Sequence, residues 1–165
     1  MFTVGILTIS DKGSRGERQD KSGEAIREML SGADVSIVNY DIIPDEKELI
    51  VEKLVKWADE DRLDVLLTTG GTGLTPRDVT PEATLSVVDR IIPGFTEAMR
   101  AEGLKKTPMA MLSRAVVGTR GECLIINLPG SPRAVRECLE VILPVLPHAV
   151  ETLKGQAGEC ATPEA

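Results

Sequence analysis

A loop with three closely spaced glycines is the part of this sequence best suited to chemistry. The apolar run Val65–Leu67 leads, after two threonines, into Gly70, Gly71, Thr72 and Gly73. Glycines allow backbone amides to converge on a phosphate, and the threonine adds a hydroxyl donor. A tight strand-to-helix turn without a ligand would use the same residues, so the loop alone leaves both interpretations open. The two commonest nucleotide motifs, the Walker A loop and G-x-G-x-x-G, are absent from it.

Two aspartates are the candidate catalytic carboxylates. Asp45 and Asp78 each follow the predicted carboxyl end of a strand and stand at or before a helix start. Two carboxylates beside a phosphate loop would suit Mg²⁺, which prefers oxygen ligands and substrate phosphates. Structural alternatives remain open, because Asp45 would also serve as a helix N-cap and Asp78 would also pair with Arg77.

Two other predicted strands end in polar loops. Ser10 follows the first strand, and Asn127 precedes the turn of Pro129 and Gly130 after the last one. Because the carboxyl ends of parallel strands lie on one edge of a sheet, we expect these residues to join the glycine loop around one pocket. Ser131 is explained more simply as the N-cap of the next helix.

The hydrophobic pattern places these loops in a single three-layer α/β/α domain with a mostly parallel sheet, because strand-like and helix-like segments alternate. Asp45 and Glu48 have the spacing of a capping box, and Thr80 suits the N-cap of the helix that it begins. We expect this domain to cover residues 1–155 and residues 156–165 to form a flexible tail. The predicted strands are 2–9, 35–43, 65–68 and 122–127, and the predicted helices begin near 20, 45, 80, 94 and 131.

Composition excludes several classes of function. The net charge of −7 and the aromatic fraction of 2% argue against a nucleic-acid partner that is held by phosphate neutralisation or base stacking. The single histidine, His148, argues against a Ser-His-Asp mechanism and against a histidine-built zinc site. Its plain interpretation is a helix-end residue. Any chemistry would therefore depend on carboxylates, hydroxyls, backbone amides and a hard metal ion.

The cysteines and the apolar segments indicate the cellular compartment in which the protein works. Cys123, Cys138 and Cys160 are odd in number and widely spaced, which is typical of reduced thiols. The first residues have no basic segment followed by a long apolar core, and no apolar run approaches the roughly 20 residues that span a bilayer. We expect a cytoplasmic protein that does not act at a membrane.

The motifs together resemble one known family. TTGGTG followed by TPRDVTPEAT, with IPDE upstream and AMLSR and INLPGSP downstream, is similar to the molybdopterin adenylyltransferase (MogA/MoaB) family. The similarity runs from the loop SDKGSRGERQDKSG to about Gly155. The LPGSP turn departs from the Pro-Gly-Asn-Pro form common in relatives, which leaves the role of Ser131 open.

This resemblance implies a reaction in molybdenum cofactor biosynthesis: AMP passes from ATP to the terminal phosphate of molybdopterin, pyrophosphate leaves, and Mg²⁺ is required. It implies that Asp45 and Asp78 organise the metal or act in catalysis and that the glycine loop cradles phosphate. It further implies that Ser113 contacts the pterin phosphate and that Asn127 lies at the edge of the pocket.

The resemblance also implies partners and assembly. Its members form trimers, some of them paired into hexamers, and work beside other enzymes of molybdenum-cofactor biosynthesis. Two alternatives to the adenylyl transfer remain open. One is a non-catalytic molybdopterin-binding scaffold, and the other is molybdate insertion, which the absence of the extra domains of insertion proteins makes less favoured.

Overall fold

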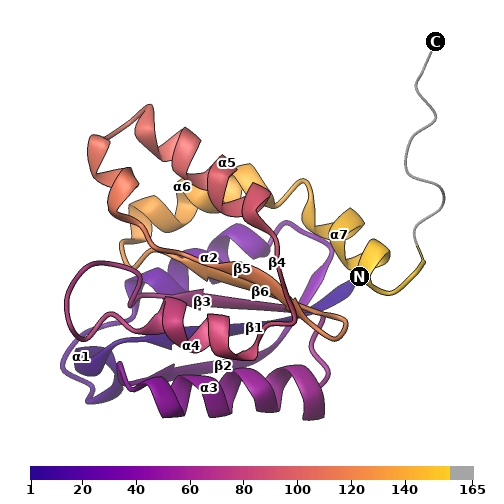
Figure 1. Cartoon of the computed structure of the whole chain (residues 1–165), viewed down its shortest axis with the longest axis horizontal. Helices are drawn as coiled ribbons and strands as arrows, with labels where there is room; N and C mark the ends of the chain where they lie inside the picture. The colour runs from indigo at the N-terminus through magenta and orange to yellow at the C-terminus, as the bar shows by residue number, and fades with distance from the viewer. Residues whose placement is uncertain (157–165) are drawn as a thin grey trace.

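A computed structural model describes residues 1–156, which fold into a three-layer α/β/α sandwich (Figure 1). The sheet of this part of the chain has six strands in the order β2-β1-β3-β6-β5-β4. The first four of these are parallel. At the far edge, β5 pairs antiparallel with β6, and β4 pairs antiparallel with β5. The predicted fold class is therefore confirmed. The predicted tail, apart from Gln156, and Cys160 lie outside the described residues.

The central strands are continuous apolar runs because both faces of the sheet are covered. They are β1 (Phe2–Ile9), β3 (Val65–Thr69) and β6 (Cys123–Leu128), with β2 (Val35–Ile43) at the edge. In the middle of the sheet, Leu67 lies between Ile6 on β1 and Ile126 on β6. This register brings the carboxyl ends of β1, β3 and β6 together, and β2 ends beside them.

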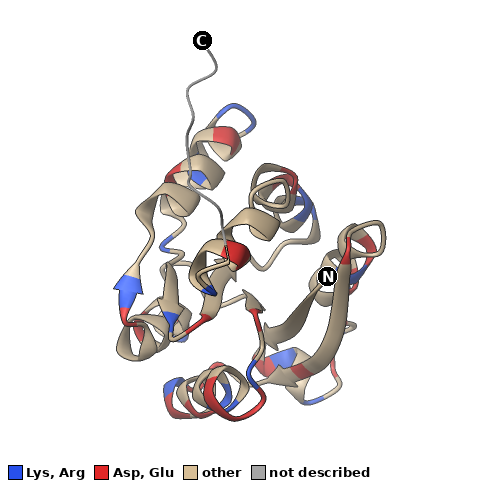
Figure 2. Cartoon of the chain, turned by 90° about the vertical axis from the view of Figure 1, so that its right-hand side faces the viewer, with Lys and Arg blue, Asp and Glu red and all other residues tan. Residues whose placement is uncertain are grey.

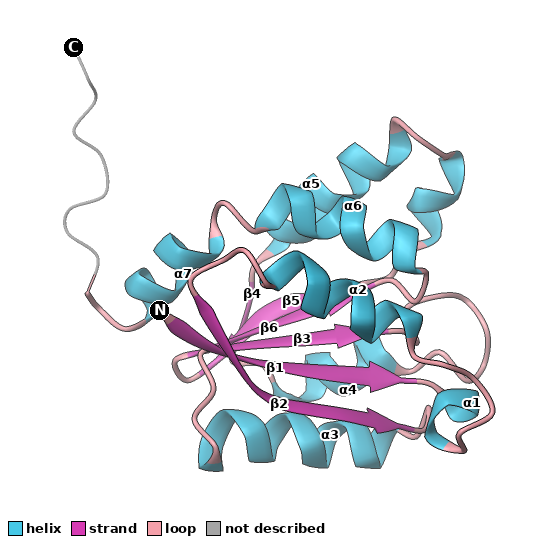
Figure 3. Ribbon diagram, turned by 180° about the vertical axis from the view of Figure 1, so that it is seen from behind, coloured by secondary structure: helices cyan, strands magenta, loops and turns pink. Residues whose placement is uncertain are grey.

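Helices cover both faces, as Figure 3 shows from behind. Buried side chains of one face of the sheet pack against one set of helices in one apolar core, and those of the other face pack against the second set in a separate core. The first set is α2 (Lys21–Leu30), α5 (Pro93–Leu104), α6 (Pro132–Ile142) and α7 (Leu146–Leu153). The second set is α3 (Lys47–Val55), continued by the π-helical turn η1 (Lys56–Glu60), and α4 (Thr80–Val87).

Short elements complete the fold. A one-turn helix, α1 (Asp11–Ser14), follows β1, and a 3₁₀ segment, η2 (Pro108–Leu112), follows α5. The sequence pattern missed β4 (Arg90–Ile91) and β5 (Val117–Arg120). β5 forms a hairpin with β6 through Gly121, whose φ of 54° suits glycine, and the predicted strand start at residue 122 falls in this turn.

Two predicted helix caps are wrong. Glu46 occupies the N-cap position of α3, and no side chain caps that end, so Asp45 and Glu48 do not form a capping box. Thr80 is already helical, and its hydroxyl donates to the Gly70 carbonyl at 2.9 Å instead of capping α4. Ser131 does cap α6, because its Oγ accepts from the Ala134 N–H at 3.1 Å. Asp45 is thereby left for a role outside helix capping.

Charged residues of both signs are spread over the helices and loops in the view of Figure 2, and the strands carry few of them. No helix among residues 1–156 is long and apolar enough to cross a bilayer.

Candidate functional site

The carboxyl ends of the parallel strands surround two cavities. The larger, of about 530 Å³, is called the polar cavity, and the smaller, of about 360 Å³, is called the apolar cavity. The predicted residues that line the polar cavity are Ser10, Asp45, Gly70, Gly71, Asp78 and Gly130. Those that line the apolar cavity are Thr72, Gly73, Ser113, Asn127 and Pro129. The structure therefore brings every predicted site residue to this edge and divides them between two neighbouring spaces.

The glycine loop and the Pro129–Gly130 turn contribute to both cavities and are bonded to each other. Gly70 donates its N–H to the Leu128 carbonyl at 3.2 Å, and the Thr69 hydroxyl donates to the Pro129 carbonyl at 2.7 Å. The loop changes cavity between Gly71 and Thr72, and the turn changes cavity between its two residues. Together they form a thin wall between the two spaces.

Backbone geometry explains the glycines of this wall. Gly70 and Gly71 have φ values of 96° and 67°, in the left-handed region that side chains disfavour. A Cβ on Gly70 would collide with the Ile9 carbonyl, one on Gly71 with the Thr80 hydroxyl, and one on Gly73 would lie 2.8 Å from Asp78 Oδ2. The loop therefore runs too close to β1, α4 and Asp78 for any larger residue.

The wall also carries unpartnered backbone donors. Within residues 1–156, the N–H groups of Gly71, Thr72 and Gly73 donate to no other group of the protein, and those of Gly130 and Ser131 also have no acceptor. Thr72 is only 6% exposed, so its free N–H is largely removed from water. Buried backbone donors are normally paired, and donors that converge without a partner are typical of an anion-binding loop.

Asp45 projects from the end of β2 into the polar cavity. Its Oδ2 accepts from the Asp11 N–H at 2.9 Å, and no described residue donates to Oδ1. Burial raises the pKa of this carboxyl above its ordinary value, and the charges of Asp11 and Asp78 add to the effect. The carboxylate is therefore placed where a cation would be favourable.

Asp78 faces the same cavity from the loop that precedes α4. Its Oδ2 accepts from the backbone N–H and the hydroxyl of Thr75, at 2.9 and 2.8 Å. In the described part of the chain Oδ1 has no donor. Arg77 does not pair with Asp78: its guanidinium bonds to Asp11 at 2.9 and 3.0 Å and to Glu46 at 2.9 Å. The salt-bridge interpretation of Asp78 is therefore wrong.

Ser10 is occupied within the protein. Its Oγ caps α1 by accepting from the Gly13 N–H at 3.0 Å, and its N–H donates to the Ile43 carbonyl. Ser10 therefore shapes the rim of the polar cavity and fixes the turn that carries Asp11.

The sequence reasoning missed Arg114, which holds the glycine loop in place. Its side chain donates to the Gly73 carbonyl at 2.8 Å and to the Asp78 carbonyl at 2.7 Å, and it pairs with Glu82. Its N–H also donates to the Thr72 carbonyl at 3.0 Å. A single arginine thus ties both ends of the loop to α4. Its position directly after Ser113 in the LSR motif is the only signal in the sequence that points to it.

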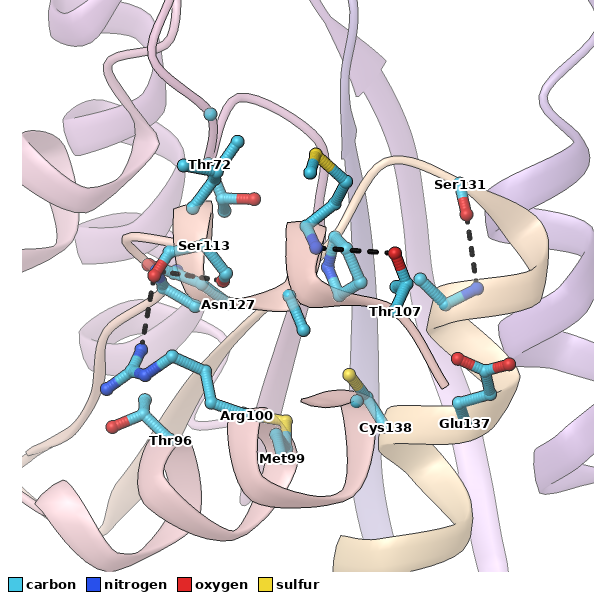
Figure 4. Close-up of a pocket in the computed structure, with 18 residues that line it drawn as sticks. Thr72, Thr96, Met99, Arg100, Thr107, Ser113, Asn127, Ser131, Glu137 and Cys138 are labelled. Carbon is cyan, nitrogen blue, oxygen red and sulfur yellow. Dashed lines mark hydrogen bonds between the residues drawn. The ribbon is translucent and has the colours of Figure 1, made fainter. Parts of the chain in front are cut away.

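Ser113 lies on the wall of the apolar cavity opposite α5 (Figure 4). Its carbonyl accepts from Arg100 at 3.3 Å, and its hydroxyl accepts a long bond from the Ala115 N–H at 3.4 Å. Arg100 is partly buried and makes no ion pair with any described residue. It brings one positive charge to an otherwise largely apolar space, and no pattern in the sequence indicated it.

Asn127 lines the apolar cavity, and its side chain is bonded within the protein. Its side chain is fully buried, and all of its polar atoms are bonded within the protein. The amide nitrogen donates to the hydroxyls of Thr68 and Thr84 at 3.0 and 2.9 Å, and the oxygen accepts from the Val116 N–H at 3.0 Å. Asn127 therefore anchors the segment that follows Ser113.

The donors available for a metal ion are few. No group of three or more His, Cys, Asp or Glu side chains in the described residues could hold a metal by itself. Asp45 and Asp78 each offer one free oxygen to the polar cavity, so they fit an ion that takes its remaining ligands from water and substrate phosphates. Magnesium commonly binds in this way.

A family profile described as "Probable molybdopterin binding domain" matches residues 5–148. A molybdopterin adenylyltransferase from Helicobacter pylori is 46% identical over 154 residues, which cover 92% of this chain and 88% of that protein. A molybdopterin adenylyltransferase from Escherichia coli is 40% identical over 172 aligned residues, covering 96% of this chain and 88% of that protein.

The chain is also similar in structure to a solved protein. The crystal structure of the molybdopterin biosynthesis enzyme MoaB from Thermus thermophilus superposes with a TM-score of 0.90 at 58% sequence identity. The superposition covers 94% of this chain and 98% of that one.

Proposed function

The chain belongs to the molybdopterin adenylyltransferase (MogA/MoaB) family, and from this premise we propose that it transfers AMP from ATP to molybdopterin. An oxygen of the terminal phosphate of molybdopterin attacks the α-phosphorus of ATP. The bond between the α-phosphorus and the oxygen that bridges to the β-phosphate breaks. Adenylyl-molybdopterin and pyrophosphate are the products.

The single observation that carries this proposal is the wall of unpartnered amides between two cavities. A reaction between two phosphates needs both to be held close together, and it gains most from positioning and charge stabilisation. In the proposal the nucleotide phosphates lie in the polar cavity and the pterin in the apolar cavity. The amides of Gly71–Gly73 then face the reacting phosphates from the wall.

The protein groups have separate tasks in this scheme. Asp45 and Asp78 would hold a magnesium ion, and the bound ion would supply charge neutralisation for the nucleotide phosphates. Arg114 keeps the glycine loop in register, and Asn127 keeps Ser113 at the wall of the apolar cavity. The largely apolar lining of that cavity excludes water from the attacking phosphate.

Pyrophosphate release tests the proposal. Purified protein is incubated with molybdopterin, ATP and Mg²⁺, and each reactant is omitted in turn. We expect pyrophosphate and adenylyl-molybdopterin only in the complete mixture. Molybdopterin binding without any pyrophosphate would support the non-catalytic scaffold instead, and release of AMP dependent on molybdate would support metal insertion.

Assembly and location follow the family resemblance. We propose a homotrimer, or two trimers paired into a hexamer, that works in the cytoplasm beside other enzymes of molybdenum-cofactor biosynthesis. Sedimentation equilibrium of the purified protein distinguishes trimer from hexamer, and a monomer at micromolar concentration would contradict the proposal.

A further inference from the structure

Two cations of the polar cavity have no partner in the protein. Arg18 and Lys21 line this cavity, and neither makes a hydrogen bond through its side chain or an ion pair within residues 1–156. Two arginines outside the lining of this cavity are engaged: Arg15 pairs with Glu17, and Arg77 pairs with Asp11 and Glu46. Arg18 and Lys21 are therefore the positive charges that remain available to a ligand.

Neighbouring carboxylates do not compete for these two cations. Glu17 is held by Arg15 at 2.9 Å, and Glu24 accepts from the Gln19 amide at 3.0 Å. Asp20 also lines the polar cavity, but its oxygens accept from four local donors: Thr8 and Ser22 hydroxyls at 2.6 and 3.1 Å, the Gly23 N–H at 2.9 Å, and the Tyr40 hydroxyl.

The same bonds fix the backbone from which the cations extend. Asp20 is the N-cap of α2, so its bonds to β1 and β2 hold the first helical residue, Lys21, at a set position. A Cβ on Gly23 would collide with Asp20 Oδ2, which shows how closely this turn is packed. Lys21 is thus a long, flexible side chain on a rigid base, and Arg18 lies three residues before it in the sequence.

We propose that Arg18 and Lys21 bind the β- and γ-phosphates of ATP, and so bind the pyrophosphate that leaves; this rests on the proposed adenylyl transfer. A triphosphate brings several negative charges into a cavity that already contains three carboxylates. One divalent ion held by Asp45 and Asp78 would not balance that charge. Charge-assisted bonds from a guanidinium and an ammonium at the rim supply the remainder.

Binding of inorganic tripolyphosphate tests this proposal without any turnover. Its affinity in the presence of Mg²⁺ is measured by calorimetry for the wild type and for the Arg18→Gln/Lys21→Gln double variant. The Lys12→Gln/Lys47→Gln double variant is the matched control. It removes the same charge just beyond the ends of β1 and β2, at residues that neither line the cavity nor make an ion pair within residues 1–156. AMP binding is measured with each protein.

We expect a loss of roughly tenfold for each cation, and about a hundredfold for the double variant, because bonds to charged groups are worth more than neutral ones. The control variant and all AMP affinities should change less than about threefold. Equal losses in both double variants would show that the overall positive charge, and not contact with Arg18 and Lys21, determines the affinity for tripolyphosphate. That result would overturn the proposal. Equal loss of AMP binding, or no tripolyphosphate binding by the wild type, would also overturn it.

This result is separable from the proposed function. If tripolyphosphate binding depends on Arg18 and Lys21 but molybdopterin receives no AMP, the phosphate contact stands and the proposed function fails. If the Arg18→Gln/Lys21→Gln variant transfers AMP normally with an unchanged KM for ATP, the phosphate contact is contradicted and the proposed function stands.

Discussion

Replacing Asn127 with alanine should destabilise the protein strongly, because the change removes a buried network of three hydrogen bonds. The lost bonds join Asn127 to Thr68, Thr84 and the Val116 N–H. At about 1 kcal/mol for each bond, with a further cost for the Val116 N–H that is left without its acceptor, the free energy of unfolding should fall by about 3–4 kcal/mol. For a domain of this size, this lowers Tm by roughly 10 °C.

Urea unfolding followed by circular dichroism measures this loss at a fixed protein concentration. Asn39→Ala is the matched control, since Asn39 is the other asparagine of the chain and makes one exposed hydrogen bond, to Asp61. The control should change the free energy of unfolding by less than about 0.5 kcal/mol. If Asn127→Ala unfolds at the same urea concentration as the wild type but no longer binds molybdopterin, the structural role is refuted. The side chain would then contact the ligand.

Three other predictions concern the wall and its carboxylates. Arg114→Met should lower kcat at least tenfold while the fold is retained, and Arg114→Lys should not restore it because one ammonium cannot reach both carbonyls; a fully active lysine variant would contradict this. Gly70→Ala should cost at least about 1–2 kcal/mol of stability in thermal unfolding, whereas Gly32→Ala, whose Cβ meets no atom within 4 Å, should be nearly neutral. The raised pKa of Asp45 means that its protonated form favours the fold below its ordinary pKa of 3.8 and that this contribution is lost as pH rises through the folded-state pKa. Asp45→Asn should therefore be more stable than the wild type at pH 7, and the difference should vanish toward pH 3; a constant difference in Tm would contradict the assignment.

Strands buried on both faces were the easiest part of the fold to predict. The bounds of β1 agree with the expected range because it is an apolar run that ends before Ser10. The bounds of β2, a partly exposed edge strand, also agree, because Pro44 follows it. β4 and β5 were missed because they are short and because their antiparallel pairing depends on the hairpin with β6, which no local pattern encodes.

The site residues were predictable by type but not by their partners. The glycine loop and both aspartates stand out because they follow strands directly. The division into two cavities was not predictable, since it depends on the contact of the loop with the Pro129–Gly130 turn, about 60 residues away. Arg114 was missed for the same reason: its contacts reach back 41 residues to Gly73 and 36 to Asp78.

Asp45 shows how a local rule can fail at such a site. Its position before α3 is typical of an N-cap, yet its carboxylate accepts from the backbone N–H of Asp11, the first residue of α1, and faces the polar cavity. The aspartate is partly buried beside other carboxylates, where its negative charge is unfavourable, although at a helix end it would be stabilising. Such placement is typical of functional carboxylates.

Transfer of the α-phosphate is the most direct test of the proposed activity. ATP labelled at the α-phosphorus is incubated with molybdopterin, Mg²⁺ and either wild-type protein, Asp45→Asn or Asp78→Asn, after circular dichroism has shown that all three are folded. We expect labelled adenylyl-molybdopterin from the wild type and at least a hundredfold slower labelling by each variant. Labelling at the wild-type rate by both variants, or unlabelled molybdopterin after incubation with the wild type, would contradict the proposed activity.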